Sequence, residues 1–161
     1  MELEYLRECT KIYDNCLYTA EAHHIIALRN KRHEKLFQLV PAIVAALMTT
    51  LAAGQIVPSW VGYATAIAAV LTAITTVLDP SKNYYEHLSA ARAFTALKQD
   101  ADSLMNTFGN FLDGDALGLA VKQLHDRYND LIAVAPPTDD SAFGKAQARI
   151  QLKKVHEPDT H

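Results

Sequence analysis

Histidine and cysteine are the residues of this chain with the widest chemistry, because both bind metals and take part in acid–base or nucleophilic catalysis. The chain has seven histidines and two cysteines. No two histidines are four residues apart and none lies beside a pair of cysteines, so their spacing does not predict a metal site. The sequence also lacks a P-loop, a glycine-rich dinucleotide turn and a nucleophile elbow. We therefore expect no enzyme, no catalytic residue and no cofactor.

Two pairs of these residues leave alternatives open. Cys9 and Cys16 are seven residues apart and share one face of a predicted helix. They are interpreted as small apolar packing residues in a reducing compartment, with an inter-subunit disulfide as the alternative. The neighbours His23 and His24 could form a pH-dependent switch, but polar packing is the simpler interpretation.

Basic side chains could hold a phosphate group, and they occur in two places. Arg92 and Lys98 lie on a predicted helix far from the uncharged segment described below, and they are candidate phosphate or nucleotide contacts or else ordinary solvated charges. A second group could bind a nucleotide phosphate, but membrane topology and anionic lipid headgroups explain it fully. This membrane-proximal basic cluster consists of Arg29, Lys31, Arg32 and Lys35.

The basic cluster is followed by an uncharged segment. Within 161 residues of net charge −3, the 43 residues from 36 to 78 contain no Asp, Glu, Lys, Arg or His. A membrane-crossing helix needs roughly 20 apolar residues, so this length predicts two spans, 36–53 and 61–78, joined by a turn with Gly, Pro and Ser. The alternative is a buried hairpin in a soluble helical bundle. A sequence pI of about 6.1 and mixed charges disfavour a general nucleic-acid binder.

The basic cluster also predicts an orientation. Positively charged residues flank the cytoplasmic ends of spans, so the N-terminal side is expected in the cytoplasm, and two spans return the chain to that side. We therefore expect both termini in the cytoplasm.

The expected second span carries small and hydroxylated residues at helical spacing. Small residues let helices approach closely, and hydroxyls either bond back to their own helix or line a weakly polar pore. Two spans cannot enclose a pore alone, so a pore requires a homo-oligomer of four or more copies, with a tetramer favoured. The candidates for the pore or for helix packing are Gly62, Thr65, Ala66, Ala69, Thr72, Ala73 and Thr76.

Helical periodicity without strand-like alternation predicts an all-α chain. We expect a two-span transmembrane hairpin that continues into cytoplasmic amphipathic helices and assembles into an oligomer. Apolar residues at steps of three and four leave faces that need partners. They include Leu3, Cys9 or Thr10, Ala20 and His24 in the first helix, Ala91, Phe94 and Ala101 in the helix from 81, and Leu119 in the helix from 115. Gly109-Asn110 is expected to end the helix from 81, and Ser141 to cap the last helix. The expected parts are an amphipathic helix over 1–35, the hairpin over 36–78, cytoplasmic helices over 79–135, and a proline linker with a short helix and polar tail over 136–161.

Seven features follow one another in a particular order and spacing: the stretches 18–23 and 29–35, the uncharged double span, the stretches 78–82, 85–91 and 94–97, and Pro136-Pro137. Together they resemble the SLATT family, whose members are two-span effectors associated with bacterial nucleotide-signalling systems. The resemblance covers about residues 5–155.

The resemblance implies an antiphage, abortive-infection effector that damages the inner membrane when a nucleotide signal changes. It implies, as partners, the lipid bilayer and a nucleotide or oligonucleotide made by a nucleotidyltransferase. It carries no catalytic or ligand residue over to this chain. We therefore expect an ion-conducting pore, with a membrane-anchored scaffold that recruits a partner through its helical stalk as the alternative.

Overall fold

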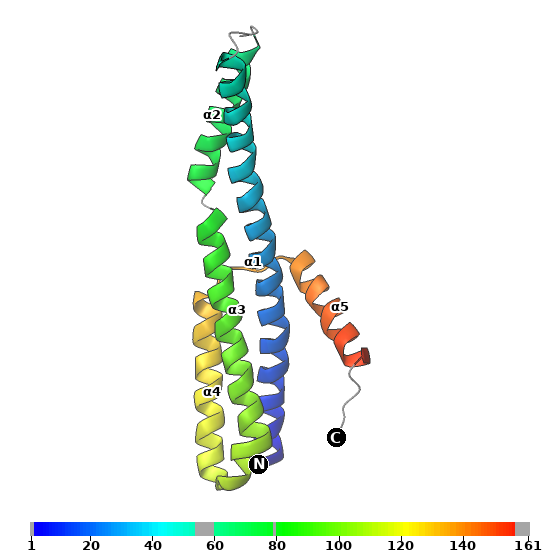
Figure 1. Ribbon diagram of the computed structural model, residues 1–161. Helices are drawn as coiled ribbons and strands as arrows, with labels where there is room; N and C mark the ends of the chain where they lie inside the picture. The colour runs from blue at the N-terminus through cyan, green and yellow to red at the C-terminus, as the bar shows by residue number, and fades with distance from the viewer. Residues whose placement is uncertain (1, 54–59, 79, 157–161) are drawn as a thin grey trace. The chain divides into compact units, whose positions relative to one another are not determined.

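The computed structural model describes residues 2–53, 60–78 and 80–156. Within these residues the chain forms helices and no strand, which confirms the all-α prediction (Figure 1). The α-helices are α1 (Glu2–Ala53), α2 (Val61–Leu78), α3 (Pro80–Ser103), α4 (Gly114–Val134) and α5 (Asp140–His156). The turn expected between the two uncharged helices falls at 54–59, outside the described residues.

Aspartates fix the starts of α4 and α5. The carboxylate of Asp113 accepts a hydrogen bond from the backbone N–H of Ala116 at 2.8 Å, and that of Asp139 accepts one from Ala142 at 2.7 Å. Each bond satisfies a backbone donor that has no partner within the helix. The sequence had indicated Ser141 as the cap of the last helix, but the cap is Asp139.

The connection between α3 and α4 is wound in two steps. A π-helical turn (Leu104–Phe108) follows α3, and a 3-10 turn (Gly109–Phe111) follows that. A Cβ at Gly109 would lie 2.4 Å from the carbonyl oxygen of Leu104, so only glycine fits this winding. The sequence predicted the end of the helix at this glycine, because Gly109-Asn110 is a turn signal.

The described chain divides into two compact units. The first unit comprises residues 1–27 and 85–161, and the second comprises Leu28–Tyr84. α1 and α3 contribute residues to both. The sequence analysis divided the chain into four consecutive parts, 1–35, 36–78, 79–135 and 136–161. The first unit instead combines two segments that are far apart in sequence.

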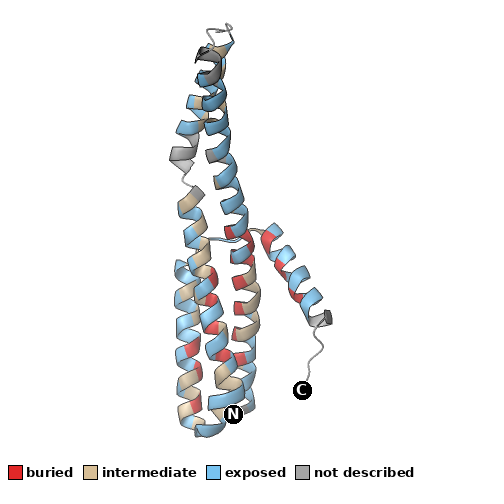
Figure 2. Cartoon of the chain, in the orientation of Figure 1, coloured by how far each residue is buried: buried red, intermediate tan, exposed pale blue. Residues whose placement is uncertain are grey.

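The first unit has an apolar core where the N-terminal part of α1 packs against α3 and α4 (Figure 2). Phe94, Ile12 and Leu97 are its largest apolar side chains with almost no exposure. Tyr5 packs beside it, and a Cβ at Gly118 would lie 2.9 Å from the Tyr5 ring, so a larger residue at this position would displace that ring. The buried residues of this core are Cys9, Ile12, Cys16, Ala20, Phe94, Leu97, Ala101, Leu117, Val121 and Leu124.

A smaller apolar cluster attaches α5 to α1. Ala142 and Ala146 of α5 are buried against the α1 residues Ala22, Ile25 and Ile26. Alanine side chains let the two helix backbones come close, but they remove little apolar area from water. The attachment of α5 therefore rests on a small contact.

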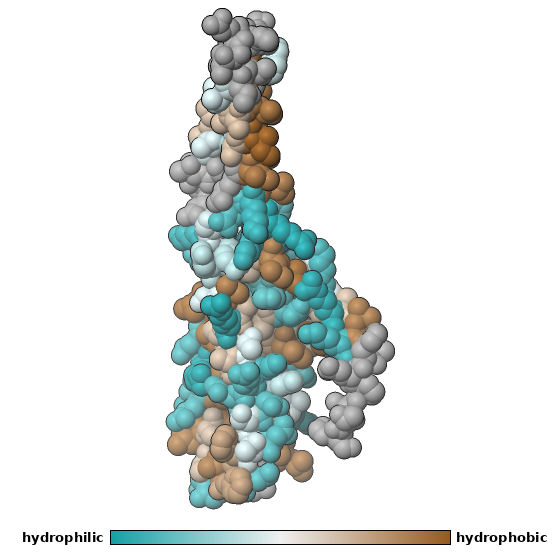
Figure 3. Space-filling model, in the orientation of Figure 1, coloured by the Kyte–Doolittle hydropathy of each residue, from teal (hydrophilic) through white to brown (hydrophobic). Residues whose placement is uncertain are grey.

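The second unit has a different character. Among its residues with described burial none is buried, and the side chains of Leu36, Ile43, Tyr63 and Ile67 are all about half exposed or more. Figure 3 shows brown, apolar side chains gathered on this part of α1. Apolar surface of this extent is rare on a soluble monomer and indicates a surface that contacts something else.

The predicted two-span transmembrane hairpin is wrong as a description of these helices. Within the described residues, no helix is long and apolar enough to cross a membrane. The length of α2 is one reason, because its 18 residues are near the lower limit for a span.

Truncation of the core should be costly where truncation of the surface is not. We expect Leu97→Ala, at a side chain with 0% exposure, to lower the free energy of unfolding by about 2–5 kcal/mol, because it leaves a cavity among α1, α3 and α4. The control Leu119→Ala, at a side chain with 59% exposure, should change it by less than about 1 kcal/mol. Chemical denaturation followed by circular dichroism measures both, and equal losses would contradict this core.

Candidate functional site: a basic groove in the first unit

A groove of about 550 Å³ lies in the first unit, between α1, α3 and α5. This volume is in the range of small-molecule sites. The groove brings together residues from three segments that are remote in sequence. Its lining is formed by Leu17, Ala20, Glu21, His24, Leu88, Ala91, Arg92, Thr95, Ala96, Lys98, Gln99 and Lys153.

Helix α3 supplies both predicted phosphate contacts. Arg92 and Lys98 both line the groove, and their separation of six residues corresponds to about 9 Å along the helix axis. The Lys98 ammonium lies 5.8 Å from the centre of the Tyr13 ring, a cation–π distance that helps hold this side chain along α1. The structure thus places the two residues in one site, as their interpretation as ligand contacts requires.

Helix α5 adds a third cation, Lys153, which the sequence analysis did not identify. α5 is positioned beside α1 by the alanine cluster and by two further contacts. Arg149 Nη1 donates to Glu21 Oε1 at 3.0 Å, and the rings of Phe143 and Tyr18 lie 6.2 Å apart. No local signal marks Lys153, because its place in the groove depends on where α5 docks.

The charges of the groove favour an anion. Arg92, Lys98 and Lys153 face one carboxylate, Glu21, and the Arg149 guanidinium already occupies that carboxylate. Within the described residues, none of the three groove cations forms an ion pair. Uncompensated like charges around a concave surface raise the local concentration of anions, and Arg and Lys donate strong hydrogen bonds to phosphate oxygens.

The adjacent histidines have different surroundings. His24 is exposed and lines the groove, whereas His23 is 1% exposed and lies within the first unit. The Nδ1 atoms of His23 and His87 are 3.0 Å apart, so one ring donates a hydrogen bond to the other, and His23 also stacks on Phe94. Burial and then the charge of His87 lower the pKa of His23 to about 4. His23 is therefore neutral at physiological pH, and only His24 is available to a ligand in the groove.

The membrane-proximal basic cluster lies in the second unit, and its members do not line the groove. Arg29, Lys31, Arg32 and Lys35 are exposed. Lys31 Nζ lies 5.3 Å from the centre of the Tyr84 ring, and nearby Ser81 donates a hydrogen bond to Glu34 at 2.8 Å. The structure gives no contact of this cluster that decides between phosphate and lipid headgroups.

The candidates for the pore or for helix packing lie on α2 and face outward. Gly62, Thr65 and Thr72 are exposed, and nothing lies within 4 Å of a Cβ placed on Gly62. The hydroxyls of Thr65 and Thr72 donate to the carbonyls of Val61 and Ala68 at 2.8 and 2.9 Å, the bonds back to their own helix that the sequence left open. Of the others, Ala66, Ala69 and Ala73 are exposed, and the side chain of Thr76 is outside the described part.

The two cysteines pack in the core of the first unit, where both have 0% exposure. Burial raises the pKa of Cys9 and raises that of Cys16 to about 11. Each is a free thiol, consistent with the interpretation as small apolar packing residues.

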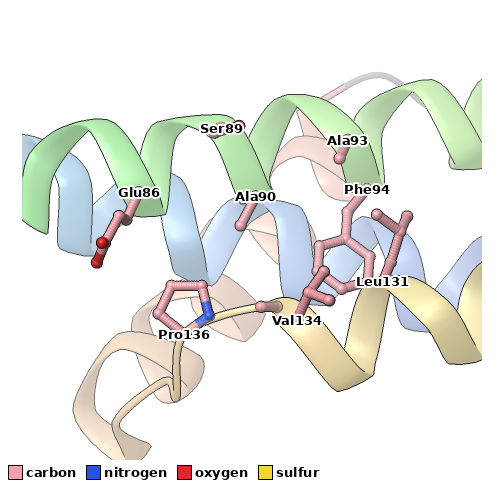
Figure 4. Close-up of a pocket in the computed structure, with 9 residues that line it drawn as sticks. Glu86, Ser89, Ala90, Ala93, Phe94, Leu131, Val134 and Pro136 are labelled. Atoms are coloured by element: carbon pink, nitrogen blue, oxygen red, sulfur yellow. The ribbon is translucent and has the colours of Figure 1, made fainter.

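A second cavity, of about 500 Å³, lies between α3, the end of α4 and the proline linker (Figure 4). Phe94, Leu131, Val134 and Pro136 give it an apolar wall, and Glu86 lies at one end. It has no cluster of charged or hydrogen-bonding groups that could orient a polar ligand. The basic groove is therefore the stronger candidate site.

Comparison with protein families gives one match that spans nearly the whole chain. A model described as SMODS and SLOG-associating 2TM effector domain family 4 matches residues 3–159. Neither the curated proteins nor the solved structures gave a match.

The buried histidine should make stability depend on pH. Above pH 6.5 His23 is neutral in both the folded and the unfolded chain. Below pH 6.5 the unfolded chain protonates His23, whereas the folded chain does so only near pH 4. We therefore expect the free energy of unfolding to fall as pH drops through this window, by on the order of 3 kcal/mol from this residue. His23→Gln should remove that part of the loss, and the control His24→Gln should retain it. Urea unfolding at several pH values measures it, and identical profiles for wild type and His23→Gln would contradict this assignment.

Charge reversal on α3 should weaken anion binding. We expect Arg92→Glu with Lys98→Glu to raise the Kd for inorganic pyrophosphate and for a linear diadenylate at least about tenfold, because two charge-assisted hydrogen bonds are lost and repulsion replaces them. The matched control reverses Lys122 and Lys145, two exposed lysines outside the groove. Calorimetry measures the affinities, and unchanged values for the α3 variant would discard the groove.

Proposed function

Because the chain belongs to the SMODS and SLOG-associating 2TM effector domain family 4, we propose that it is the effector of a bacterial antiphage system that permeabilises the inner membrane under the control of a nucleotide signal. In this proposal a partner nucleotidyltransferase makes the nucleotide or oligonucleotide. Copies of the chain assemble into an ion-conducting oligomer of at least four subunits, with both termini in the cytoplasm.

The observation that carries the proposal is the division of the chain into two units of opposite character. The first unit has an apolar core and a cationic groove. The second unit has exposed apolar side chains, no charge between residues 36 and 78, and no buried residue among those with described burial. A sensing part needs a fixed site for a soluble ligand, and a part that acts on lipid needs apolar surface without charge.

The contact with lipid is assigned to exposed side chains and not to a two-span hairpin. Leu39, Leu47, Tyr63, Ile67 and Val70 are 57–76% exposed. In water this surface is unfavourable, and association with lipid or with other copies would cover it. Assembly is therefore expected to depend on this unit, and its exposed threonines would contribute hydroxyls to any conducting path.

The nucleotide control is assigned to the first unit. Its groove offers three cations without acidic partners within the described residues, together with Gln99 and Thr95 as hydrogen-bonding groups. Whether a ligand promotes or prevents assembly depends on which state binds it better, because a ligand stabilises the state for which it has higher affinity.

Permeabilisation tests the proposal with two matched substitutions. We expect wild-type protein added to vesicles of anionic phospholipid to release a trapped ionic dye. Ile67→Glu, at an exposed apolar position of the second unit, should reduce the initial rate at least about tenfold, because a charge in contact with lipid costs roughly 2–3 kcal/mol. Leu119→Glu, at a similarly exposed position of α4 in the first unit, should release dye like wild type.

Two further results would distinguish permeabilisation from the alternative function, a membrane-anchored scaffold. Vesicle-bound wild-type protein that retains the dye, with and without a linear diadenylate, would reject permeabilisation. Replacement of residues 36–78 by an unrelated uncharged hairpin, with antiphage protection retained, would favour the membrane-anchored scaffold instead.

A further inference from the structure

We propose that helix α5 is a clasp, and that a phosphate-bearing ligand closes it by binding Lys153 of α5 together with Arg92 and Lys98 of α3. The proposal rests on the ligand-binding part of the proposed function, because it concerns how the same groove responds to its ligand. It adds a moving element and a direction of response.

The first argument is that α5 is attached to the rest of the first unit by few contacts. Of its described residues, only Ala142, Ala146 and Ile150 are buried, and two of these are alanines. The chain enters α5 through 135–139, a linker with two prolines. Elements with little buried apolar area open more readily than the core of the same domain.

The second argument is electrostatic. Docked α5 places the Lys153 ammonium in a groove already lined by Arg92 and Lys98. The one acidic side chain of the groove, Glu21, accepts its bond from Arg149 of the same helix. The Arg149–Glu21 pair favours docking, but its side chains are 54% and 25% exposed, so water and salt weaken it. Without an anion, repulsion among the three groove cations opposes docking.

The third argument is that a bound anion makes the three groove cations favour docking of α5 instead of opposing it. A phosphate-bearing ligand between α3 and α5 turns the three cations from mutually repelling groups into common ligands of one anion. Because ligand and α5 then stabilise each other, occupation of the groove favours docking, and docking raises the affinity of the groove.

Docking of α5 changes the exposure of one apolar face of α1. Docked α5 covers Ala22, Ile25 and Ile26 of α1, and undocked α5 exposes them. This apolar face ends at Ile26, two residues before the second unit begins at Leu28. Ligand binding would therefore decide whether this part of α1 is covered by α5 or available to another copy or partner.

Hydrogen–deuterium exchange of the full chain tests the clasp. The probes are inorganic pyrophosphate, a linear diadenylate and vesicles of phosphatidylglycerol, which separate a soluble phosphate from a lipid headgroup. We expect a saturating probe to slow exchange of the amides in 140–153 by roughly fivefold or more. Lys153→Gln should reduce this effect to below about twofold, and the control Lys145→Gln, on the same helix but outside the groove, should keep it.

A merely structural role for Lys153 is distinguished in the absence of any probe. If repulsion opposes docking, the α5 amides of Lys153→Gln exchange as slowly as those of wild type or more slowly. If Lys153 only holds α5 in place, the α5 amides of the variant exchange faster. The proposal is overturned by that lower protection, by probe binding without change in α5 exchange, or by the absence of binding of all three probes.

The outcomes also separate this proposal from the proposed function. Protection of α5 by the diadenylate without dye release from vesicles keeps the clasp and rejects permeabilisation. Protection by phosphatidylglycerol vesicles alone keeps the clasp and rejects control by a soluble nucleotide.

Discussion

The burial of Phe94 is the interaction on which the first unit depends. Its ring stacks on His23 of α1 at 5.7 Å and meets Tyr128 of α4 edge-on at 6.5 Å. One side chain thereby joins three helices and sets the rotation of α3 about its own axis. With Phe94 turned inward, residues two before it and four after it, Arg92 and Lys98, lie along the groove. The geometry of the candidate site is therefore a consequence of core packing.

The same packing explains why a histidine is tolerated inside. His23 has its ring face against Phe94 and its Nδ1 against that of His87, so its polar edge has a partner while its carbon surface is covered. Burial favours the neutral ring, and a neutral ring can share one proton with its neighbour. The buried His23 is thus a packing residue with a hydrogen-bond partner, and ligand recognition is left to the exposed His24.

The second unit follows a different physical logic. From residue 36 to residue 78 its α1 and α2 segments have no charge, yet none of its residues with described burial is completely buried. A pair of helices offers each residue only one neighbouring helix, so most of an apolar surface stays uncovered. The first unit reaches burial because it surrounds α1 and α3 with further helices. The second unit needs surfaces from outside the single chain.

Much of the helix pattern could be predicted from sequence. The steps of three and four correctly marked Ala91, Phe94 and Ala101 of α3 as core, and likewise Cys9 and Ala20 of α1. The prediction failed where the sequence offered two adjacent candidates. It chose His24 over the buried His23, and it included Leu3 and Leu119, which are 82% and 59% exposed. A single helix cannot decide such cases, because which side of an apolar stripe is buried depends on the helices packed against it.

The sequence by itself determined the all-α class, the family, the uncharged segment and the two cations of α3, because each is written in local periodicity, order or residue type. It overestimated the uncharged segment as a two-span hairpin, because lack of charge resembles a membrane span, whereas no helix of the described residues is long and apolar enough to cross a membrane. Only the tertiary structure decided that Arg92, Lys98 and Lys153 line one groove and that Glu21 is already occupied there. The physical reason is that α5 reaches α1 through contacts more than 100 residues apart in sequence, such as Arg149 with Glu21, and no local pattern encodes such a contact.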